Sequence, residues 1–232
     1  MADKLLFGIP SKGRLMERTL EVFKDAGLTI EKKGHERGYL GCIRELPSVE
    51  VAFLSATEIA LFIKRGHIHI GVTGEDLLRE TVSDADARVD FLKQLGFGHA
   101  DVIVAVPTCW IDVDRVAELE SIADTFRRVH HRRLRVATKY LNLTRQFFAS
   151  RGVTSYRIVE SLGATEGTPA AGTAEFIVDI TSTGATLAAN NLKVLEDGVI
   201  LKSQANLVAS RGAEWSSPTH EARNEILHRL EP

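Results

Sequence analysis

The chain has 232 residues, of which 44% are hydrophobic and 26% are charged, so its composition is that of a globular protein rather than a disordered or fibrous one. Its 29 basic and 31 acidic residues leave a formal net charge of -2, which argues against a protein that coats nucleic acid or an anionic membrane. The longest strongly apolar run, 102–106, is far shorter than the roughly 20 residues that a membrane-spanning helix needs.

Predicted strands and helices alternate along most of the chain. In the first half, apolar runs predict strands at 5–9, 49–54 and 68–72, helical periodicity predicts helices at 15–26, 57–64 and from 74 onward, and 39–45 is typical of a hairpin. In the second half, strands are expected at 102–106, 134–137, 156–159, 175–180, 193–201 and 205–209, and helices at 122–129, 143–150, 184–190 and from Pro218, with Ser217 as N-cap. Such alternation predicts an α/β fold with a parallel-type sheet covered by helices.

The sequence contains no repeat of fixed period and no low-complexity linker, so an internal boundary should be a crossover of the chain rather than a tether. We expect crossovers near 106–107 and 190–191. This predicts a discontinuous lobe I, residues 1–105 and 191–232, and a lobe II, residues 106–190. Two lobes joined in this way leave a cleft, where ligands preferentially bind.

The segment 1–10 has neither the apolar length nor the small-residue cleavage site of a signal peptide. The two cysteines, Cys42 and Cys109, lie far apart and lack metal-binding spacing. We therefore expect free thiols in a cytoplasmic protein.

The segment 175–186 has the most informative pattern for function. A strand ends at Asp179 and turns through Thr181, Ser182, Thr183, Gly184, Ala185 and Thr186 into a helix. Backbone N–H groups at a helix start, with hydroxyl side chains around them, suit a phosphate, and a neighbouring carboxylate suits ribose hydroxyls. Because Ser and Thr are also good helix caps, a capped helix without a ligand explains the same residues.

A second strand–turn–helix segment carries two cations. Lys12 and Arg14 flank Gly13 at a predicted helix start, where the helix dipole disfavours positive charge. A bound anion would offset this cost, although solvated cations would lose only tenths of a kcal/mol. Arg37 is a further cation in a loop.

The order and spacing of several segments resemble those of the ATP phosphoribosyltransferase family. These segments are Pro-Ser-Lys-Gly-Arg at 10–14, Gly-Val-Thr-Gly-Glu-Asp-Leu-Leu at 71–78, Ala-Thr-Lys-Tyr at 137–140, the run 179–186, and Ala-Asn at 189–190. The resemblance extends from the first strand to about Ala209. It implies two α/β lobes like those of type II periplasmic binding proteins.

The resemblance also implies an activity and its site residues. N1 of the ATP adenine would attack C1 of phosphoribosyl pyrophosphate, pyrophosphate would leave with the aid of Mg²⁺, and phosphoribosyl-ATP would form as the first step of histidine biosynthesis. The residues of the 181–186 loop would hold the 5-phosphate, and Asp179 the ribose. Arg14 and Arg37 would face the pyrophosphate with Lys12 nearby, and Glu166 would line the same cleft. The metal would be carried mainly by the pyrophosphate, with no all-protein site.

One segment departs from the family pattern. At 54–60 the chain has Leu-Ser-Ala-Thr-Glu-Ile-Ala, where many members have an arginine followed by an Asp-Ile-Pro-like run. We therefore exclude this segment from the predicted site. Asn191 also stands where glycine is usual.

Two further patterns have alternative explanations. His67 and His69 share one face of a predicted strand, which allows a metal site but no third ligand is spaced nearby. The basic run 127–135 could contact RNA, but it lacks interleaved aromatic residues and lies at a helix end, so the sequence favours a solvated face or a partner surface.

The alternative function is a noncatalytic two-lobed protein that binds a small phosphorylated or carboxylated solute. For the enzyme, the resemblance implies a homodimer without nucleic-acid or membrane partners. Only about 20 residues follow Ala209, which resembles the short form of the family. That form lacks a histidine-binding domain and assembles with a regulatory subunit resembling histidyl-tRNA synthetase.

Overall fold

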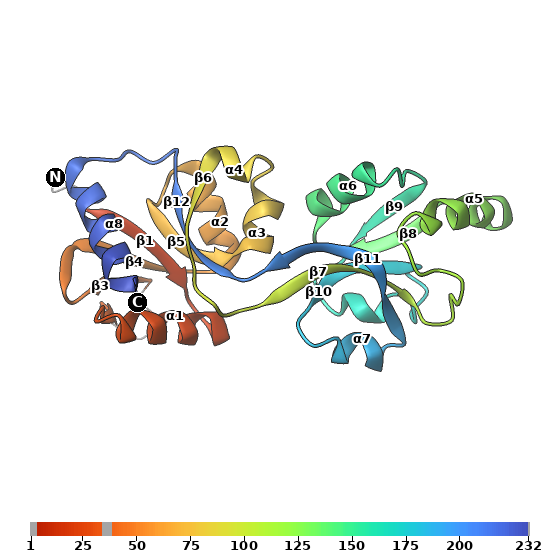
Figure 1. Cartoon of the computed structure of the whole chain (residues 1–232), viewed down its shortest axis with the longest axis horizontal. Helices are drawn as coiled ribbons and strands as arrows, with labels where there is room; N and C mark the ends of the chain where they lie inside the picture. Colours follow the sequence, from red (N-terminus) through yellow and green to blue (C-terminus); the bar gives the residue numbers. More distant parts are fainter. Residues whose placement is uncertain (1–3, 34–38, 232) are drawn as a thin grey trace. The chain divides into compact units, whose positions relative to one another are not determined.

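The computed structural model describes residues 4–33 and 39–231. The chain forms two compact units: the first comprises Met1–Gly98 with Gln204–Pro232, and the second comprises His99–Ser203. Figure 1 shows that each unit has its own sheet and helices. In the described part of the chain, no helix has the length and apolar character that crossing a membrane requires.

The first unit contains a seven-stranded mixed sheet of order β2-β3-β4-β1-β5-β12-β6. Strand β1 pairs in parallel with both β4 and β5, whereas β12 runs antiparallel to β5 and β6. The elements of this unit are β1 (Leu5–Pro10), α1 (Gly13–Asp25), β2 (Ile30–Lys32), β3 (Leu40–Ile43), β4 (Leu46–Leu54), α2 (Ala56–Arg65), β5 (Ile70–Gly74), α3 (Glu75–Thr81), α4 (Ala85–Arg88), β6 (Val89–Gln94), β12 (Ala205–Ser210) and α8 (Ser217–Leu230).

Helices cover both faces of this sheet because its central strands are apolar on both sides. Leu207 and Ala209 of β12 belong to the core under α1 and α8, whereas Val208 between them belongs to the core under α2 and α3. This alternation follows from the two-residue period of a strand. The buried strands therefore show near-continuous apolar runs in the sequence.

The second unit contains a five-stranded sheet of order β11-β7-β10-β8-β9. Strand β10 pairs in parallel with β8 on one side and antiparallel with β7 on the other. The elements of this unit are β7 (Ala100–Pro107), α5 (Glu118–His130), β8 (Leu134–Thr138), α6 (Leu141–Ser150), β9 (Tyr156–Glu160), the 3-10 helix η1 (Thr165–Gly167), β10 (Phe176–Thr181), α7 (Ala185–Ala189) and β11 (Leu192–Ser203).

The central strand β10 is covered on both faces. Ile177 packs in a core with Leu187 of α7 and Ile103 of β7. On the other face, the ring of Phe176 lies 6.0 Å from that of Phe148 in α6. Strand β10 is thereby fixed in the middle of the unit, and the loop that follows it starts from a rigid support.

The α/β class and the alternation of elements are confirmed. The expected parallel pairing occurs in part of each sheet, between β1 and its neighbours β4 and β5 and between β8 and its neighbours β10 and β9, and the other strand pairs are antiparallel. Strand β6 and the short elements β2, α4 and η1 were not predicted. The last helix begins at Ser217 and is capped by Ser216, one residue before the predicted cap.

The unit boundaries also differ from the predicted ones. The chain divides at 98/99 and 203/204 rather than at 105/106 and 190/191. The reason is that β7 and β11 pair antiparallel along almost their whole lengths, from Leu192 opposite Pro107 to Ser203 opposite Ala100. Both strands therefore lie in the second sheet.

Candidate active site

The candidate site begins where β10 ends. Asp179 and Thr181 alternate with Ile180, so they lie on the same side of the strand as Ile177, the side that α7 covers. Pairing with β7 sets Asp179 opposite Ile103 and Thr181 opposite Asp101. The rigid central strand thus presents a carboxylate and a hydroxyl directly before the loop.

Gly184 allows the turn from β10 into α7. Its φ of +74° lies in the left-handed region, which L side chains rarely adopt, and it is the residue that precedes the helix. The Gly184 N–H donates to Thr181 Oγ1 at 3.0 Å, and the Ala185 N–H donates to Thr183 Oγ1 at 3.4 Å. The hydroxyl groups of Thr181 and Thr183 therefore stabilise the turn.

Several backbone donors of the loop are left without a partner. Within residues 4–33 and 39–231, no acceptor takes a hydrogen bond from the N–H groups of Ser182, Thr183 and Thr186. The side chains of these three residues are exposed. Unpaired N–H groups next to hydroxyls form a concave site for an anion such as a phosphate.

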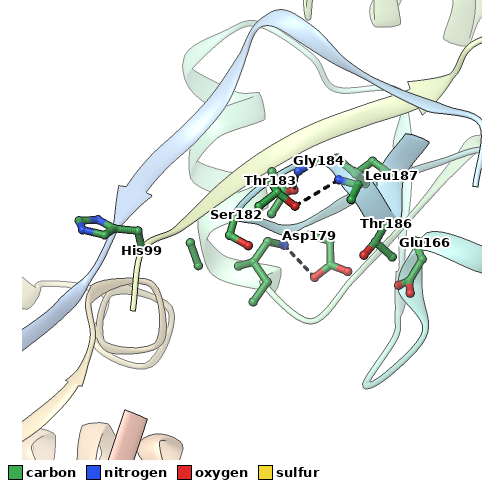
Figure 2. A pocket seen from close by; sticks show the side chains of 12 residues that line it. His99, Glu166, Asp179, Ser182, Thr183, Gly184, Thr186 and Leu187 are labelled. Atoms are coloured by element: carbon green, nitrogen blue, oxygen red, sulfur yellow. Dashed lines mark hydrogen bonds between the residues drawn. The ribbon is translucent and has the colours of Figure 1, made fainter. Parts of the chain in front are cut away.

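The loop lines a cavity of about 200 Å³ within the second unit. Figure 2 shows the loop side chains gathered around the Asp179 carboxylate, with Glu166 beside them. The lining residues are His99, Ala100, Glu166, Asp179, Ile180, Thr181, Ser182, Thr183, Gly184, Ala185, Thr186 and Leu187. The structure therefore brings Asp179, Glu166 and the whole predicted loop into one pocket.

Burial raises the pKa of the Asp179 carboxyl above its ordinary value of 3.8, and the negative charge of Glu166 contributes to the rise. Three contacts act in the opposite direction: the Ile180 N–H, which donates to Asp179 Oδ1 at 2.8 Å, the positive charge of Lys139, and the hydroxyl of Thr165. A positively charged or hydroxyl-bearing ligand would therefore stabilise the ionised form of the Asp179 carboxyl group.

Glu166 is supported by a short helical turn. It lies in η1 after Ala164, whose φ of +50° is uncommon for a residue other than glycine. The neighbouring Thr165 is buried and donates to Ser161 Oγ at 3.0 Å. These contacts fix the turn that brings the second carboxylate to the pocket.

The predicted cations lie elsewhere in the chain. Lys12 and Arg14 belong to the first unit, at the start of α1, and both are exposed. Neither has an ion-pair partner among the residues that the structure describes. Arg37 lies outside the described residues.

Sequence reasoning missed Lys139 as a site residue. It follows the last residue of β8, the parallel neighbour of β10, and its charge lowers the pKa of Asp179. Its Nζ lies 5.0 Å from the centre of the Tyr140 ring. The carboxyl ends of neighbouring parallel strands lie at one edge of a sheet, so the pairing of β8 with β10 brings Lys139 near Asp179, but the sequence alone does not specify this pairing.

The segment that departs from the family pattern has a structural role. Ser55 Oγ accepts from the Glu58 N–H at 3.2 Å, and Glu58 Oε2 accepts from the Ser55 N–H at 2.8 Å. These two bonds form a capping box at the start of α2. They also lower the pKa of Glu58.

The histidine pair is held by structural contacts. His69 Nδ1 accepts from the Leu6 N–H at 3.0 Å, and its Nε2 lies 3.1 Å from the Glu214 carbonyl oxygen. Because both ring nitrogens of His69 are engaged, the structure does not favour the metal alternative. No group of three or more His, Cys, Asp or Glu residues in the described part of the chain could hold a metal ion.

The basic run surrounds a helix end. Helix α5 ends at His130, and Arg132 and Arg135 both donate to the Glu175 carboxylate. Arg127 and Arg128 are exposed. This arrangement favours a solvated helix end or a partner surface over an RNA site.

Comparison with known proteins relates this architecture to one enzyme family. Residues 55–232 match the sequence profile of HisG, the ATP phosphoribosyltransferase. The chain is 60% identical over 230 residues to the ATP phosphoribosyltransferase of Nitrobacter winogradskyi and 58% identical to that of Bradyrhizobium diazoefficiens. Each match covers 99% of this chain and 71% of the relative.

Solved structures have the same fold. The chain superposes on the ATP phosphoribosyl transferase (HisG:HisZ) complex from Thermotoga maritima with a TM-score of 0.73 at 24% identity, over 98% of this chain and 96% of that one. It also superposes on the arginine-, lysine-, histidine-binding protein ArtJ from Geobacillus stearothermophilus, with a TM-score of 0.55 at 10% identity over 98% and 88% of the two chains. These likenesses confirm the expected periplasmic-binding-protein-like fold.

Proposed function

Because the chain belongs to the ATP phosphoribosyltransferase family, we propose that the pocket at the end of β10 holds its phosphoribosyl donor. The enzyme transfers the phosphoribosyl group of phosphoribosyl pyrophosphate to N1 of the ATP adenine, the first step of histidine biosynthesis. The observation that carries the proposal is the set of unpaired N–H groups in the loop, beside a carboxylate.

Thr181, Ser182, Thr183, Gly184, Ala185 and Thr186 bind the 5-phosphate of the donor. The N–H groups of Ser182, Thr183 and Thr186 supply hydrogen bonds, and the exposed hydroxyls add further donors. Asp179 and Glu166 accept hydrogen bonds from the ribose hydroxyls. A ribose hydroxyl on Asp179 would satisfy a carboxylate whose ionised form is disfavoured by burial.

Arg14 and Arg37 stabilise the leaving pyrophosphate, with Lys12 nearby. The resemblance of the 10–14 segment to the family supports this role, as do the exposure of Lys12 and Arg14 and the absence of a described ion-pair partner for either. An unpaired guanidinium can form two parallel hydrogen bonds to a phosphate without breaking an existing contact.

The chemistry requires charge stabilisation more than proton transfer. As the bond from C1 to pyrophosphate breaks, the ribose becomes electron-poor and the pyrophosphate gains negative charge. The carboxylate of Asp179 balances the positive charge on the ribose, and the arginines balance the negative charge. N1 of adenine carries a free electron pair, so no general base is needed.

Asp179 and Glu166 are oxygen donors of the kind that Mg²⁺ accepts, but the described residues form no all-protein metal site. Mg²⁺ carried mainly by the pyrophosphate oxygens would neutralise part of the leaving group's charge. The two carboxylates would then hold the ribose side of the donor next to it.

We also propose that the protein is a cytoplasmic homodimer that assembles with a histidyl-tRNA-synthetase-like regulatory subunit. The similar structure from Thermotoga maritima is a HisG:HisZ complex, which is consistent with such a partner. The chain spans 71% of the length of the curated relatives that it matches. The regulatory subunit is therefore proposed from the family and not from the length of this chain. Family membership also favours the enzyme over a noncatalytic solute-binding protein.

The test is a direct assay. The protein is mixed with ATP, phosphoribosyl pyrophosphate and Mg²⁺, with and without the regulatory subunit, and the ultraviolet absorbance of N1-substituted adenine is followed. We expect product, and we expect Arg14→Ala to lower turnover more than it weakens ATP binding. No product in the presence of the regulatory subunit, at any enzyme concentration, would refute the enzyme assignment.

A further inference from the structure

Strand β9 is the last strand of the five-stranded sheet, next to β8 in Figure 1. It pairs in parallel with β8 on one side, and in the part of the chain that the structure describes no strand pairs with its other side. A strand with one open edge presents a row of backbone donors and acceptors to which another strand can add. Strand β9 therefore has an unused pairing surface.

The backbone groups of β9 alternate between its two edges. The Ser161 N–H donates to the Thr138 carbonyl oxygen at 3.0 Å, so the odd-numbered residues of β9 turn their N–H and C=O groups toward β8. The groups of the even-numbered residues, Tyr156, Ile158 and Glu160, consequently point to the open edge. These three residues can exchange hydrogen bonds with a second strand.

An open, mostly apolar hollow lies beside this edge. It has a volume of about 450 Å³ and is lined from α6, from the segment after it and from β9, by Arg145, Ala149, Val153, Thr154, Tyr156 and Ile158. Leu162, which lies shortly after the end of β9, is 84% exposed. An exposed leucine and an apolar hollow both gain free energy when a partner removes them from water.

Opposite charges flank the same edge. Arg145 lines the hollow and Glu160 is the last residue of β9; both are exposed, and neither forms an ion pair with another described residue. Burial raises the pKa of the Tyr156 hydroxyl, and the positive charge of Arg145 acts in the opposite direction, which places Arg145 near Tyr156. The start of β9 therefore has a cation available for pairing, and its end has a carboxylate.

We infer that β9 pairs antiparallel with β9 of a second copy of this chain, about a twofold axis at Ile158. The outward backbone groups of Ile158 then face those of Ile158 in the other copy, and those of Tyr156 face those of Glu160. The two residues of each facing pair exchange both of their hydrogen bonds. The two five-stranded sheets thereby join into one. This inference rests on the proposed homodimer and assigns its surface.

The same axis brings complementary side chains together. Tyr156 and Glu160 lie on one face of the strand because side chains alternate, and this is the face on which Tyr156 lines the hollow. Glu160 of one copy therefore faces Tyr156 of the other and lies next to its Arg145. Just past the strand, Leu162 of one copy comes to the end of the hollow that Thr154 lines in the other. Each of these contacts occurs twice.

A strand from a different protein fits this edge less specifically. It would form the same backbone hydrogen bonds, because these do not depend on the side chains. It would also have to supply a carboxylate opposite Tyr156 and an apolar side chain at the Thr154 end of the hollow. A second β9 has both at the required positions, as Glu160 and Leu162.

The first experiment measures mass by light scattering and sedimentation over a range of concentrations. We expect the wild-type chain to be a dimer and Leu162→Glu to raise its dissociation constant on the order of 100-fold, because a carboxylate would meet the apolar hollow. Ile111→Glu is the matched control: Ile111 is also in the second unit and is 78% exposed, and its substitution should leave the dimer intact. Circular dichroism checks that both variants fold.

The second experiment follows amide hydrogen exchange by NMR at concentrations where the wild-type chain is dimeric. The N–H groups of Ile158 and Glu160 should exchange on the order of tenfold more slowly in the wild type than in dissociated Leu162→Glu. Those of Arg157 and Val159 point toward β8 and should be equally protected in both. Unprotected N–H groups at Ile158 and Glu160 in a wild-type dimer would overturn the pairing of β9.

The third experiment exchanges charges. Arg145→Glu and Glu160→Arg should each weaken the dimer, because each places like charges opposite one another across the twofold axis. The double variant should restore the dimer, since the exchanged charges attract again. A double variant that binds no more tightly than the singles would overturn the antiparallel register.

The outcomes separate the two proposals. A wild-type chain that stays monomeric would overturn the homodimer and with it β9 as its surface. A wild-type dimer that Leu162→Glu leaves intact would overturn the β9 surface alone and leave the homodimer standing. Dissociation of Ile111→Glu with retention of the Leu162→Glu dimer would assign the interface to the surface around Ile111 instead.

Discussion

Gly184 shows how a single residue can control the shape of the phosphate loop. Its φ is +74°, and a Cβ at this position would meet no atom within 4 Å, so only backbone strain opposes a side chain. We expect Gly184→Ala to cost about 1 kcal/mol of unfolding free energy. We also expect it to raise the KM for the ribosyl donor about tenfold, because the loop donors move.

Gly152 provides the matched control. Its φ is +72°, it also has no atom within 4 Å of a Cβ, and it follows the end of α6 instead of lining the pocket. Gly152→Ala should lose the same stability by urea unfolding and leave the donor KM unchanged. Equal KM values for the two variants would show that the loop geometry does not matter for donor binding.

We expect the buried Asp179 carboxylate to lower the free energy of unfolding at neutral pH and to increase the rate of the reaction. Its folded pKa is raised above 3.8 by burial, so the folded state binds the proton more tightly than the unfolded state, and stability falls as the pH rises from 3.8 through the folded pKa. Asp179→Asn removes this cost and keeps an acceptor for the Ile180 N–H. At neutral pH we expect a thermal midpoint at or above that of the wild type, with kcat/KM lower by on the order of 10²-fold. A lower midpoint with unchanged kinetics would contradict both roles.

Lys139 lowers the pKa of Asp179 through its charge. Lys139→Met should therefore raise that pKa further and move the acid limb of the kcat/KM profile to higher pH. Lys139→Arg retains the charge and should leave the limb near its wild-type position. If the limb stays in place in the Met variant, Lys139 does not act on Asp179 during turnover.

At the scale of elements, one carboxylate joins three segments of the second unit. Glu175, just before β10, accepts from both Nη atoms of Arg132 at 3.0 and 2.9 Å and from the Arg135 N–H of β8 at 2.7 Å. Although burial opposes ionisation, these and the further Arg135 hydrogen bonds lower the pKa of Glu175 to about 2. The Glu175 carboxylate therefore links the segment after α5 and the start of β8 to the start of β10 by hydrogen bonds.

This contact should make stability depend on pH. A lowered folded pKa contributes stability that is complete above the unfolded value of 4.5 and is lost as the pH falls from 4.5 through about 2. Glu175→Gln should cost about 2 kcal/mol at pH 7 and much less at pH 2, measured by urea unfolding. An equal loss at both pH values would mean that charge is not the source of the stabilisation.

The elements also explain what the sequence could and could not predict. The loop 181–186 and Asp179 are contiguous, so one segment was sufficient to identify the pocket that they line. Lys139 is 40 residues away in the chain and reaches Asp179 only through the parallel pairing of β8 with β10, which one sequence does not specify. Strand β6 was missed because Val-Asp-Phe-Leu-Lys-Gln, at 89–94, has no clean two-residue alternation.

At the scale of the whole molecule, the units were predicted correctly in number but not in extent. A strand next to a unit boundary has the same apolar pattern as any other buried strand, so the sheet to which it belongs is decided by its pairing partner. Strands β7 and β11 pair with each other over distant sequence positions, and periodicity contains no information about that choice. The boundaries at 98/99 and 203/204 follow from this pairing.

Strand β12 lies between β5 and β6 in the first sheet, although it is made of residues 205–210. During synthesis on the ribosome, residues 99–203 are all translated before residues 205–210 of this strand. Until β12 pairs, β5 has one unpaired edge and β6 has no neighbouring strand in the sheet, and incomplete chains associate through such edges. The sheet of the first unit can therefore be completed only after the residues of the second unit have been translated.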